Sequence, residues 1–174
     1  QPGNARPEKI PSLRAAFKKD GTITAANSSS ISDGGAALIL MSESKAKEQG
    51  LTPLCKIVAH STHSQKPSEF TVAPVGAMNS VLEKAGWTTA DVDLWEINEA
   101  FAMVTMLAIN ELKLDESKVN VNGGACALGH PIGASGARIL VTLIHALKNR
   151  GLKKGIASLC IGGGEAVAMA VEAY

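Results

Sequence analysis

The chain has 174 residues, of which 45% are hydrophobic and 19% are charged, and this length is sufficient for one domain with a sizeable core. Its formal net charge of +1 argues against a nucleic-acid partner, because nucleic-acid-binding domains usually carry a marked basic excess. Since no apolar run approaches the roughly 20 residues of a membrane-spanning helix and residues 1–30 contain no apolar signal core, we expect a cytoplasmic protein with no membrane partner.

The first part of the chain, residues 1–52, contains little regular structure. Residues 1–30, which include Pro2, Pro7 and Pro11, are predicted to be a loop. Residues 36–41 predict a short apolar strand, and Ser42 is a suitable N-cap for a helix that ends before Gly50. A strand and a helix without sheet partners would expose apolar surface, so we expect this part to be covered by another chain or poorly ordered.

From residue 53 onward, apolar strands alternate with amphipathic helices. Five strands are predicted at 54–61, 92–97, 118–121, 156–160 and 166–171, and three helices at 74–85, 99–112 and 134–149. The order βαβαβαββ predicts an α/β fold in which a mixed five-stranded sheet is covered by helices.

The cysteines and histidines do not form a recognisable metal or disulfide pattern. Cys55, Cys126 and Cys160 are an odd and sparse set, which is typical of free thiols in a reducing compartment. His60 and His63 have no third or fourth ligand nearby in the sequence, so we expect no metal site.

Three polar segments follow predicted strands. They read EINEAF at residues 96–101, GHPIGASGAR at 129–138 and LCIGGG at 159–164. Taken alone, His130 is more often a surface or core histidine and Cys160 more often a small buried apolar residue. The glycines let the backbone turn sharply where a strand ends, and in α/β sheets ligand sites lie at that edge.

Together, these segments resemble three active-site blocks of the thiolase family, the acyl-CoA acetyltransferases, in the family order and about 30 residues apart. Residues 20–30 resemble a loop of the same family. The resemblance covers almost the whole chain and implies a layered thiolase-like fold: residues 1–30 are a remnant of the loop region, 31–52 the last strand and helix of the N-terminal domain, and 53–174 the C-terminal domain. The family's nucleophilic cysteine belongs to an N-terminal half outside the match.

The resemblance implies four catalytic residues. Cys160 is the acid/base that takes a proton from the α-carbon of a thioester, and a nearby imidazole or helix end can bring the pKa of such a thiol near the working pH. His130 activates the nucleophile, and its ring N–H helps to hold the enolate oxygen. Asn98 fixes a water that completes this oxyanion site, and it also suits the N-cap of the helix at 99–112. The backbone N–H of Gly162 is the expected donor to the carbonyl oxygen of the acyl-enzyme.

Three further residues are expected to line the pantetheine channel of coenzyme A: Ser29, Ala100 and Phe101. An ordinary core position is an equal alternative for Phe101. The basic side chains between Arg6 and Lys19 are interpreted as a solvated face, with attraction of CoA phosphates as the alternative. We interpret Cys126 as a packing residue, since related sequences often have a branched aliphatic residue there.

The resemblance therefore implies an acetyl-CoA acetyltransferase that joins two acetyl-CoA into acetoacetyl-CoA and CoA, or catalyses the reverse. It implies no cofactor, because the acyl-CoA thioester is itself the substrate. The expected partners are the missing N-terminal half or its equivalent and, for the complete protein, further copies in a homo-oligomer; the 174 residues alone are expected to be inactive. Two alternatives stay open: a 3-ketoacyl-CoA thiolase of fatty-acid breakdown, and a noncatalytic CoA-binding or assembly subunit.

Overall fold

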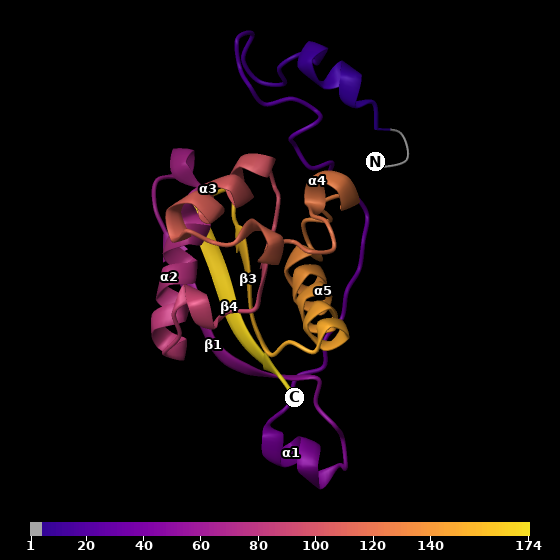
Figure 1. Cartoon of the computed structure of the whole chain (residues 1–174), viewed down its shortest axis with the longest axis vertical. Helices are drawn as coiled ribbons and strands as arrows, with labels where there is room; N and C mark the ends of the chain where they lie inside the picture. The colour runs from indigo at the N-terminus through magenta and orange to yellow at the C-terminus, as the bar shows by residue number, and fades with distance from the viewer. Residues whose placement is uncertain (1–4) are drawn as a thin grey trace.

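The computed structural model describes residues 5–174, so the loop prediction for residues 1–4, including Pro2, lies outside the described residues. A four-stranded sheet lies between helices, with α2 and α3 on one side and α5 on the other (Figure 1). The predicted α/β class with a mixed sheet is confirmed. No helix within residues 5–174 is both long and apolar enough to cross a membrane.

The sheet brings the ends of two parallel strands to the same edge. Its strands are β1 (Cys55–Ser64), β2 (Leu94–Ile97), β3 (Lys154–Cys160) and β4 (Glu165–Ala173), in the order β1-β4-β3-β2. The central strand β4 is antiparallel to both β1 and β3, whereas β2 and β3 are parallel. The segments that follow β2 and β3 therefore leave the sheet at one edge, where ligand sites of α/β sheets form.

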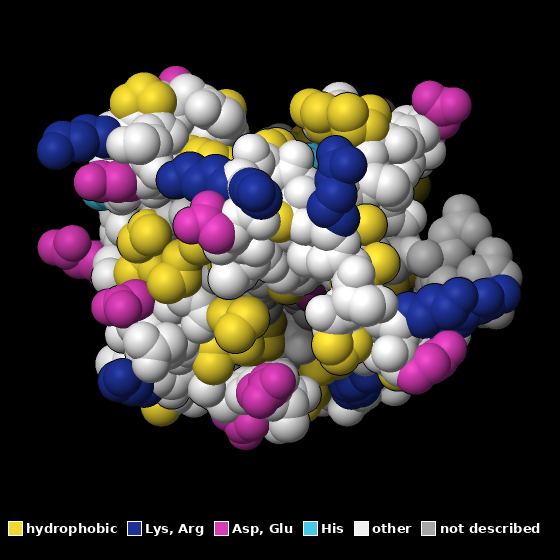
Figure 2. Space-filling model, turned by 90° about the horizontal axis from the view of Figure 1, so that it is seen from above, with side chains coloured by type: hydrophobic (Ala, Val, Ile, Leu, Met, Phe, Trp, Pro, Cys, Tyr) yellow, Lys and Arg dark blue, Asp and Glu magenta, His cyan; other side chains and the backbone are white. Residues whose placement is uncertain are grey.

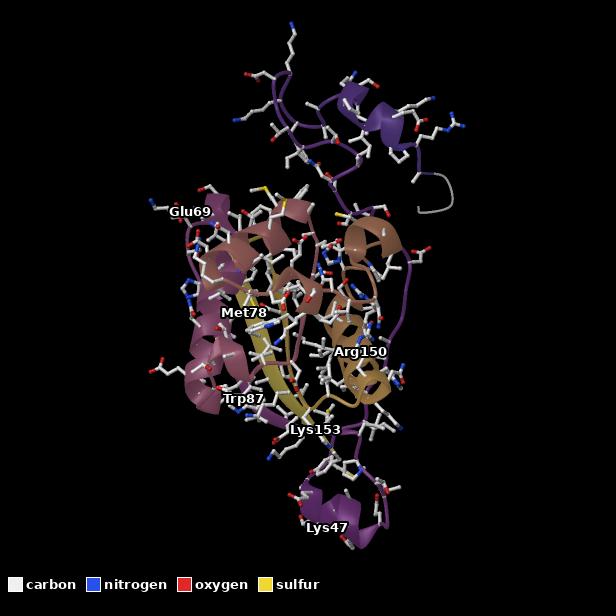
Figure 3. All side chains as sticks on the ribbon, viewed as in Figure 1. Lys47, Glu69, Met78, Trp87, Arg150 and Lys153 are labelled. Carbon is white, nitrogen blue, oxygen red and sulfur yellow. The ribbon has the colours of Figure 1, made fainter. Side chains whose placement is uncertain are left out.

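Each face of the sheet has its own apolar core. Helices α2 (Ala73–Ala85) and α3 (Ala102–Leu112) cover one face, and α5 (Ser135–Arg150) covers the other. Met78 of α2, labelled in Figure 3, packs with Trp95 in the first core, and Leu143 of α5 packs with Leu94 in the second. Because side chains alternate along a strand, the neighbours Leu94 and Trp95 serve opposite cores.

The predicted strand at 118–121 is not formed, and the sheet has four strands instead of five. Residues Glu116–Lys118 form a 3-10 helix, and only Val119 makes a β-bridge, with Trp95 of β2. Asn120 has a left-handed φ of 47°, which ends the extended conformation. Its side chain accepts from the Ile97 N–H and donates to the Ile97 carbonyl, both at 2.8 Å, and so takes the place of a strand.

The helix predicted at 99–112 begins at Ala102, so Asn98 is not its N-cap, and this alternative role is wrong. Residues 99–101 are held by other parts of the chain: Ser28 forms a β-bridge with Phe101, and the Ala102 N–H donates to the Asn27 carbonyl at 2.9 Å. A short helix that was not predicted, α4 (Ala125–Leu128), precedes His130.

The segment before β1 lies apart from the sheet. Residues 36–41 run extended but form no strand with any described residue, and Ile39 and Leu40 are 89% and 66% exposed. The predicted helix that follows is present as α1 (Glu43–Glu48), capped by the Ser42 side chain. Near the N-terminus, Pro7–Ser12 forms a 3-10 helix within the predicted loop. Figure 1 shows the extended segment beside α5, with α1 below the sheet.

Candidate active site

Two polar residues lie where the parallel strands β2 and β3 end. Asn98 follows β2, is 1% exposed, and donates its backbone N–H to the Ser158 carbonyl of β3 at 2.9 Å. Cys160 is the last residue of β3 and is 6% exposed. The amide and the thiol are therefore carried by neighbouring strands at the edge predicted from the sequence.

His130 is held between the N-terminal loop and α5. Its backbone N–H donates to the Ser30 carbonyl at 2.9 Å, and it forms a β-bridge with Ile31. The preceding Gly129 has a φ of +94°, and a Cβ there would lie 2.3 Å from the Ser32 hydroxyl oxygen. Only glycine suits that position, so this turn depends on it to place the imidazole at the start of α5.

Hydrogen bonds determine which ring nitrogen of His130 carries the proton. The Ser135 hydroxyl donates to the Pro131 carbonyl at 3.0 Å, so its oxygen, 2.6 Å from the His130 Nδ1, accepts from an Nδ1–H. The Nε2 is then unprotonated, and it accepts a hydrogen bond from the Asn98 amide N–H at 3.4 Å. Burial and, secondarily, the Arg138 cation lower the pKa of His130, which favours the neutral ring. This ring can accept a proton at Nε2.

A cavity of about 440 Å3 opens beside His130. Figure 2 shows the corresponding end of the molecule, where hydrophobic patches lie among both basic and acidic side chains. Ser29, Ala100, Phe101 and His130 all line the cavity, so four of the seven residues predicted from the sequence meet here. Ser29 donates both its hydroxyl, at 2.8 Å, and its N–H, at 3.2 Å, to the Ala100 carbonyl.

Two side chains of the N-terminal loop complete this cavity. Phe17 packs edge-on against Phe101, with ring centroids 6.1 Å apart, and Arg14 supplies a cation to the lining. The interpretation of Arg14 as part of a solvated face does not hold at this position, since its side chain lines the cavity. The nearby resemblance of residues 20–30 is the signal in the sequence that could have placed it at the site. The lining suits a thin, mostly apolar chain that ends in a negative charge.

The other three, Asn98, Cys160 and Gly162, are not among the described residues that line this cavity. Cys160 belongs to the core between the sheet and α2 and α3, and burial raises its pKa, so its resting form is the thiol. The expected lowering by an imidazole or a helix end is not seen within residues 5–174. Gly162 lies in the exposed turn between β3 and β4, and among the described residues its N–H has no backbone acceptor.

The carboxylate of Glu99, whose role was not predicted from the sequence, holds the segment after β2 in place. The Glu99 carboxylate accepts from the Cys126 N–H at 3.0 Å and from the Asn120 amide at 3.3 Å. Burial, followed by the Glu99 charge, raises the pKa of Cys126 to about 11, which fits its interpretation as a packing residue. No cluster of three potential metal ligands occurs within residues 5–174.

Comparison with family models gives two matches. The model described as "Thiolase, C-terminal domain" matches residues 51–173, and the one described as "Thiolase, N-terminal domain" matches residues 2–44. The first match alone covers more than half of the chain.

Individual proteins show the same likeness. An acetyl-CoA acetyltransferase of Thiocystis violacea is 55% identical over 165 residues, which are 95% of this chain and 42% of that protein. The crystal structure of the Bacillus anthracis acetyl-CoA acetyltransferase matches with a TM-score of 0.94 and 54% identity over 96% of this chain and 42% of that one. The crystal structure of human mitochondrial 3-ketoacyl-CoA thiolase in complex with CoA matches with a TM-score of 0.91 and 43% identity, over 98% of this chain and 43% of that one. The chain thus spans less than half the length of these relatives.

Proposed function

Because the chain belongs to the thiolase family, we propose that it supplies part of the active site of an acetyl-CoA acetyltransferase. The complete enzyme joins two acetyl-CoA into acetoacetyl-CoA and CoA, or catalyses the reverse cleavage. The observation that carries this proposal is the hydrogen bond from Asn98 to the unprotonated Nε2 of a neutral His130, beside a cavity lined by three predicted CoA-binding residues.

We propose that the cavity receives the pantetheine arm of coenzyme A. Ser29, Ala100 and Phe101 would contact the arm, and Arg14 would attract the phosphates. The relative that was crystallised with CoA supports acyl-CoA as the ligand class. No cofactor is needed, since the thioester is itself the activated substrate.

In the first half-reaction, an acyl-accepting cysteine attacks acetyl-CoA. This nucleophile would come from a segment equivalent to the part of the relatives outside the match. His130 takes its proton at Nε2, and the Gly162 N–H stabilises the negative charge that develops on the carbonyl oxygen. Cys160, a thiol at rest, protonates the departing CoA sulfur and is left as the thiolate.

In the second half-reaction, the Cys160 thiolate removes a proton from the α-carbon of the second acetyl-CoA. The His130 Nε2–H and a water held by Asn98 stabilise the enolate oxygen. The buried Oδ1 of Asn98 has no hydrogen-bond partner among the described residues, so it is available to bind such a water. The enolate attacks the acyl-cysteine, the cysteine sulfur leaves and regains its proton from the His130 Nε2, and acetoacetyl-CoA forms.

A hollow of about 1150 Å3 fits the proposed partner segment. It lies between residues 37–57, α5 and the part of the sheet beside α5, and its lining includes the exposed side chains of Ile39, Leu40 and Leu54. We propose that the remainder of a thiolase fold fills it and brings the nucleophile, that the 174 residues alone do not turn over acetoacetyl-CoA, and that the completed protein is a homo-oligomer.

The test is complementation with the N-terminal part of the Bacillus anthracis enzyme that lies outside the match. The pair should form acetoacetyl-CoA, and Cys160→Ala should abolish condensation while exchange of CoA with acetyl-CoA persists in part, because this variant loses the acid for the CoA sulfur but keeps the nucleophile and His130. Cys126→Ala, at a packing cysteine, is the matched control and should keep condensation. Unchanged condensation by the Cys160→Ala pair would contradict the proposal.

The same assay separates the alternatives. A 3-ketoacyl-CoA thiolase would cleave a longer 3-ketoacyl-CoA faster than acetoacetyl-CoA, whereas the higher identity to acetyl-CoA acetyltransferases favours the short substrate. A noncatalytic subunit would bind CoA without turnover in the complemented pair.

A further inference from the structure

Glu99 joins the segment that carries Asn98 to the segment that carries His130. Its Oε2 accepts from the backbone N–H of Cys126 at 3.0 Å, and its own carbonyl accepts from the Cys126 thiol at 3.9 Å. Cys126 lies in α4, the short helix that precedes Gly129 and His130. Glu99 in turn directly follows Asn98 at the end of β2. The two segments whose side chains meet in the candidate active site are therefore also joined through Glu99.

The chain leaves room for the Glu99 carboxylate at Gly124. A Cβ at Gly124, which is buried, would overlap the carboxyl carbon and both carboxylate oxygens of Glu99. The φ of −126° and ψ of −175° at Gly124 are open to any residue, so glycine is needed here for space and not for its conformational freedom. A side chain at this position would displace the carboxylate from the Cys126 N–H.

A second donor fixes the direction of the carboxylate. Glu99 Oε1 accepts from the Asn120 side-chain amide at 3.3 Å, and the same amide donates to the Ile97 carbonyl of β2 at 2.8 Å. Hydrogen bonds to an ionised acceptor are stronger than hydrogen bonds between neutral groups. Glu99 therefore anchors α4 to the end of β2, on which the position of Asn98 depends.

The direct contact between Asn98 and His130 is too weak to fix their separation. The Asn98 amide lies 3.4 Å from the His130 Nε2, which is long for a hydrogen bond, and both groups are neutral. On its other side, His130 is held by the Ser30 carbonyl and the Ser135 hydroxyl. The position of the ring is thus set by these contacts, and the position of the Asn98 amide relative to it by the anchor at Glu99.

The Glu99 carboxylate does not itself reach the substrate cavity. Glu99 is not among the described residues that line this cavity, and each of its carboxylate oxygens already accepts a hydrogen bond from the chain. It can therefore affect the reaction only through the groups that it holds in place.

We propose that Glu99 is a positioning residue that sets the place of the Asn98 amide relative to the His130 ring, and with it the oxyanion site for the enolate. This inference rests on the proposed function, in which the His130 Nε2–H and a water on Asn98 hold the enolate oxygen. Acylation uses His130 but not Asn98. Loss of the Glu99 contact should therefore impair condensation and spare acylation.

The test compares the two half-reactions in the pair complemented with the N-terminal part of the Bacillus anthracis enzyme. Glu99→Gln keeps the shape of the side chain but places an amide NH2 against one of the two donors. It should lower kcat of condensation by roughly tenfold or more, because small displacements of reacting groups are costly. The exchange of CoA with acetyl-CoA, and its KM for acetyl-CoA, should stay within about twofold of the parent.

A second variant moves the same carboxylate without removing its charge. Gly124→Ala should displace the Glu99 side chain and show the same loss of condensation with exchange retained. Glu116→Gln, at an exposed glutamate, is the matched control and should leave both reactions as in the parent. A role in stability alone would lower condensation and exchange together. Equal losses in the two reactions, or condensation retained by both variants, would overturn the inference.

A measurement that needs no turnover separates this inference from the proposed function. In the 174-residue chain alone, the NMR resonances of the Asn98 side-chain amide, assigned with Asn98→Asp, should shift in Glu99→Gln and Gly124→Ala but not in Glu116→Gln. If the parent pair shows neither condensation nor exchange, the proposed function fails. A shifted Asn98 amide would then still support the positioning role, and an unshifted one would contradict it.

Discussion

At the scale of single residues, the buried Glu96 makes the stability of the fold depend on pH. Its pKa is raised from 4.5 to about 7, so the protonated carboxyl favours the folded state. This stabilising effect is complete below about pH 4.5 and is lost as the pH rises through about 7. Above that pH, the folded chain holds an ionised carboxylate that burial disfavours.

Glu96→Gln should therefore stabilise the chain at neutral and alkaline pH. Glutamine resembles the protonated carboxyl, so the gain in free energy of unfolding should grow from near zero below pH 4.5 to on the order of 3 kcal/mol above pH 7. The lowered pKa of His130 affects the parent and the Glu96→Gln variant alike, so it largely cancels in the difference between their free energies of unfolding. Urea unfolding across this pH range measures the gain, and the exposed Glu116→Gln controls for the loss of one carboxylate. Parallel stability curves for Glu96→Gln and the parent would contradict the expectation.

The site residues that could be predicted from the sequence are those whose position is set by neighbouring residues in the chain. His130 follows a glycine turn and Asn98 follows a strand, and both were identified from their blocks. The roles of Ser135 and Arg138 were missed, because they depend on the rotation of α5 against β2, which helical spacing alone does not give. The burial of Cys160 and its raised pKa depend likewise on how α2 and α3 cover the strand end.

At the scale of elements, Asn120 closes the free edge of β2 with its side chain. Asn120→Ala removes the side-chain partner of the Ile97 N–H and one of two donors to the Ile97 carbonyl, which still accepts from the Thr105 hydroxyl at 3.3 Å, and it leaves alanine at a φ of 47°. We expect a loss of roughly 2 kcal/mol or more in free energy of unfolding, measured by urea denaturation. Asn120→Gly loses the same hydrogen bonds without the backbone strain, so it should cost less than Asn120→Ala, by roughly 1 kcal/mol. Equal losses would show that strain at this position contributes nothing.

The helices were predicted more accurately than the strands for a physical reason. α2 and α5 have apolar stripes and end at Gly86 and Gly151, both in the left-handed conformation, so both their faces and their ends are set locally. The strand at 118–121 and the start of α3 depend on hydrogen bonds from distant segments. The Asn120 side chain takes the hydrogen bonds that the predicted strand at 118–121 would have made. Pairing of residues 101–102 with residues 27–28 makes α3 begin at Ala102.

At the scale of the whole molecule, α5 covers only part of its face of the sheet. It packs on β2 and β3, while the large hollow beside it is lined by Leu140 and Val141 of the helix and by Leu159, Val167 and Met169 of the sheet. On the other side of that hollow, residues 36–41 are strand-like in sequence but have no strand beside them within residues 5–174. An apolar helix face and an unpaired extended segment that face one hollow are what a sheet and helix layer from another polypeptide would cover.

The hollow should therefore bind the N-terminal part of a relative, and the exposed Ile39 offers a sharp test. At a concentration 100 times its Kd, such a partner should raise the Tm of the chain by roughly 5–10 °C, because it binds the folded state only. Ile39 is 89% exposed, so Ile39→Asp should leave the free chain folded while placing a charge in the interface. We expect it to weaken binding by roughly tenfold or more in calorimetric titration. Met106→Asp is the matched control: Met106 is 67% exposed on α3, on the opposite side of the sheet, and this variant should bind as the parent does. Equal weakening by both variants would place the partner elsewhere.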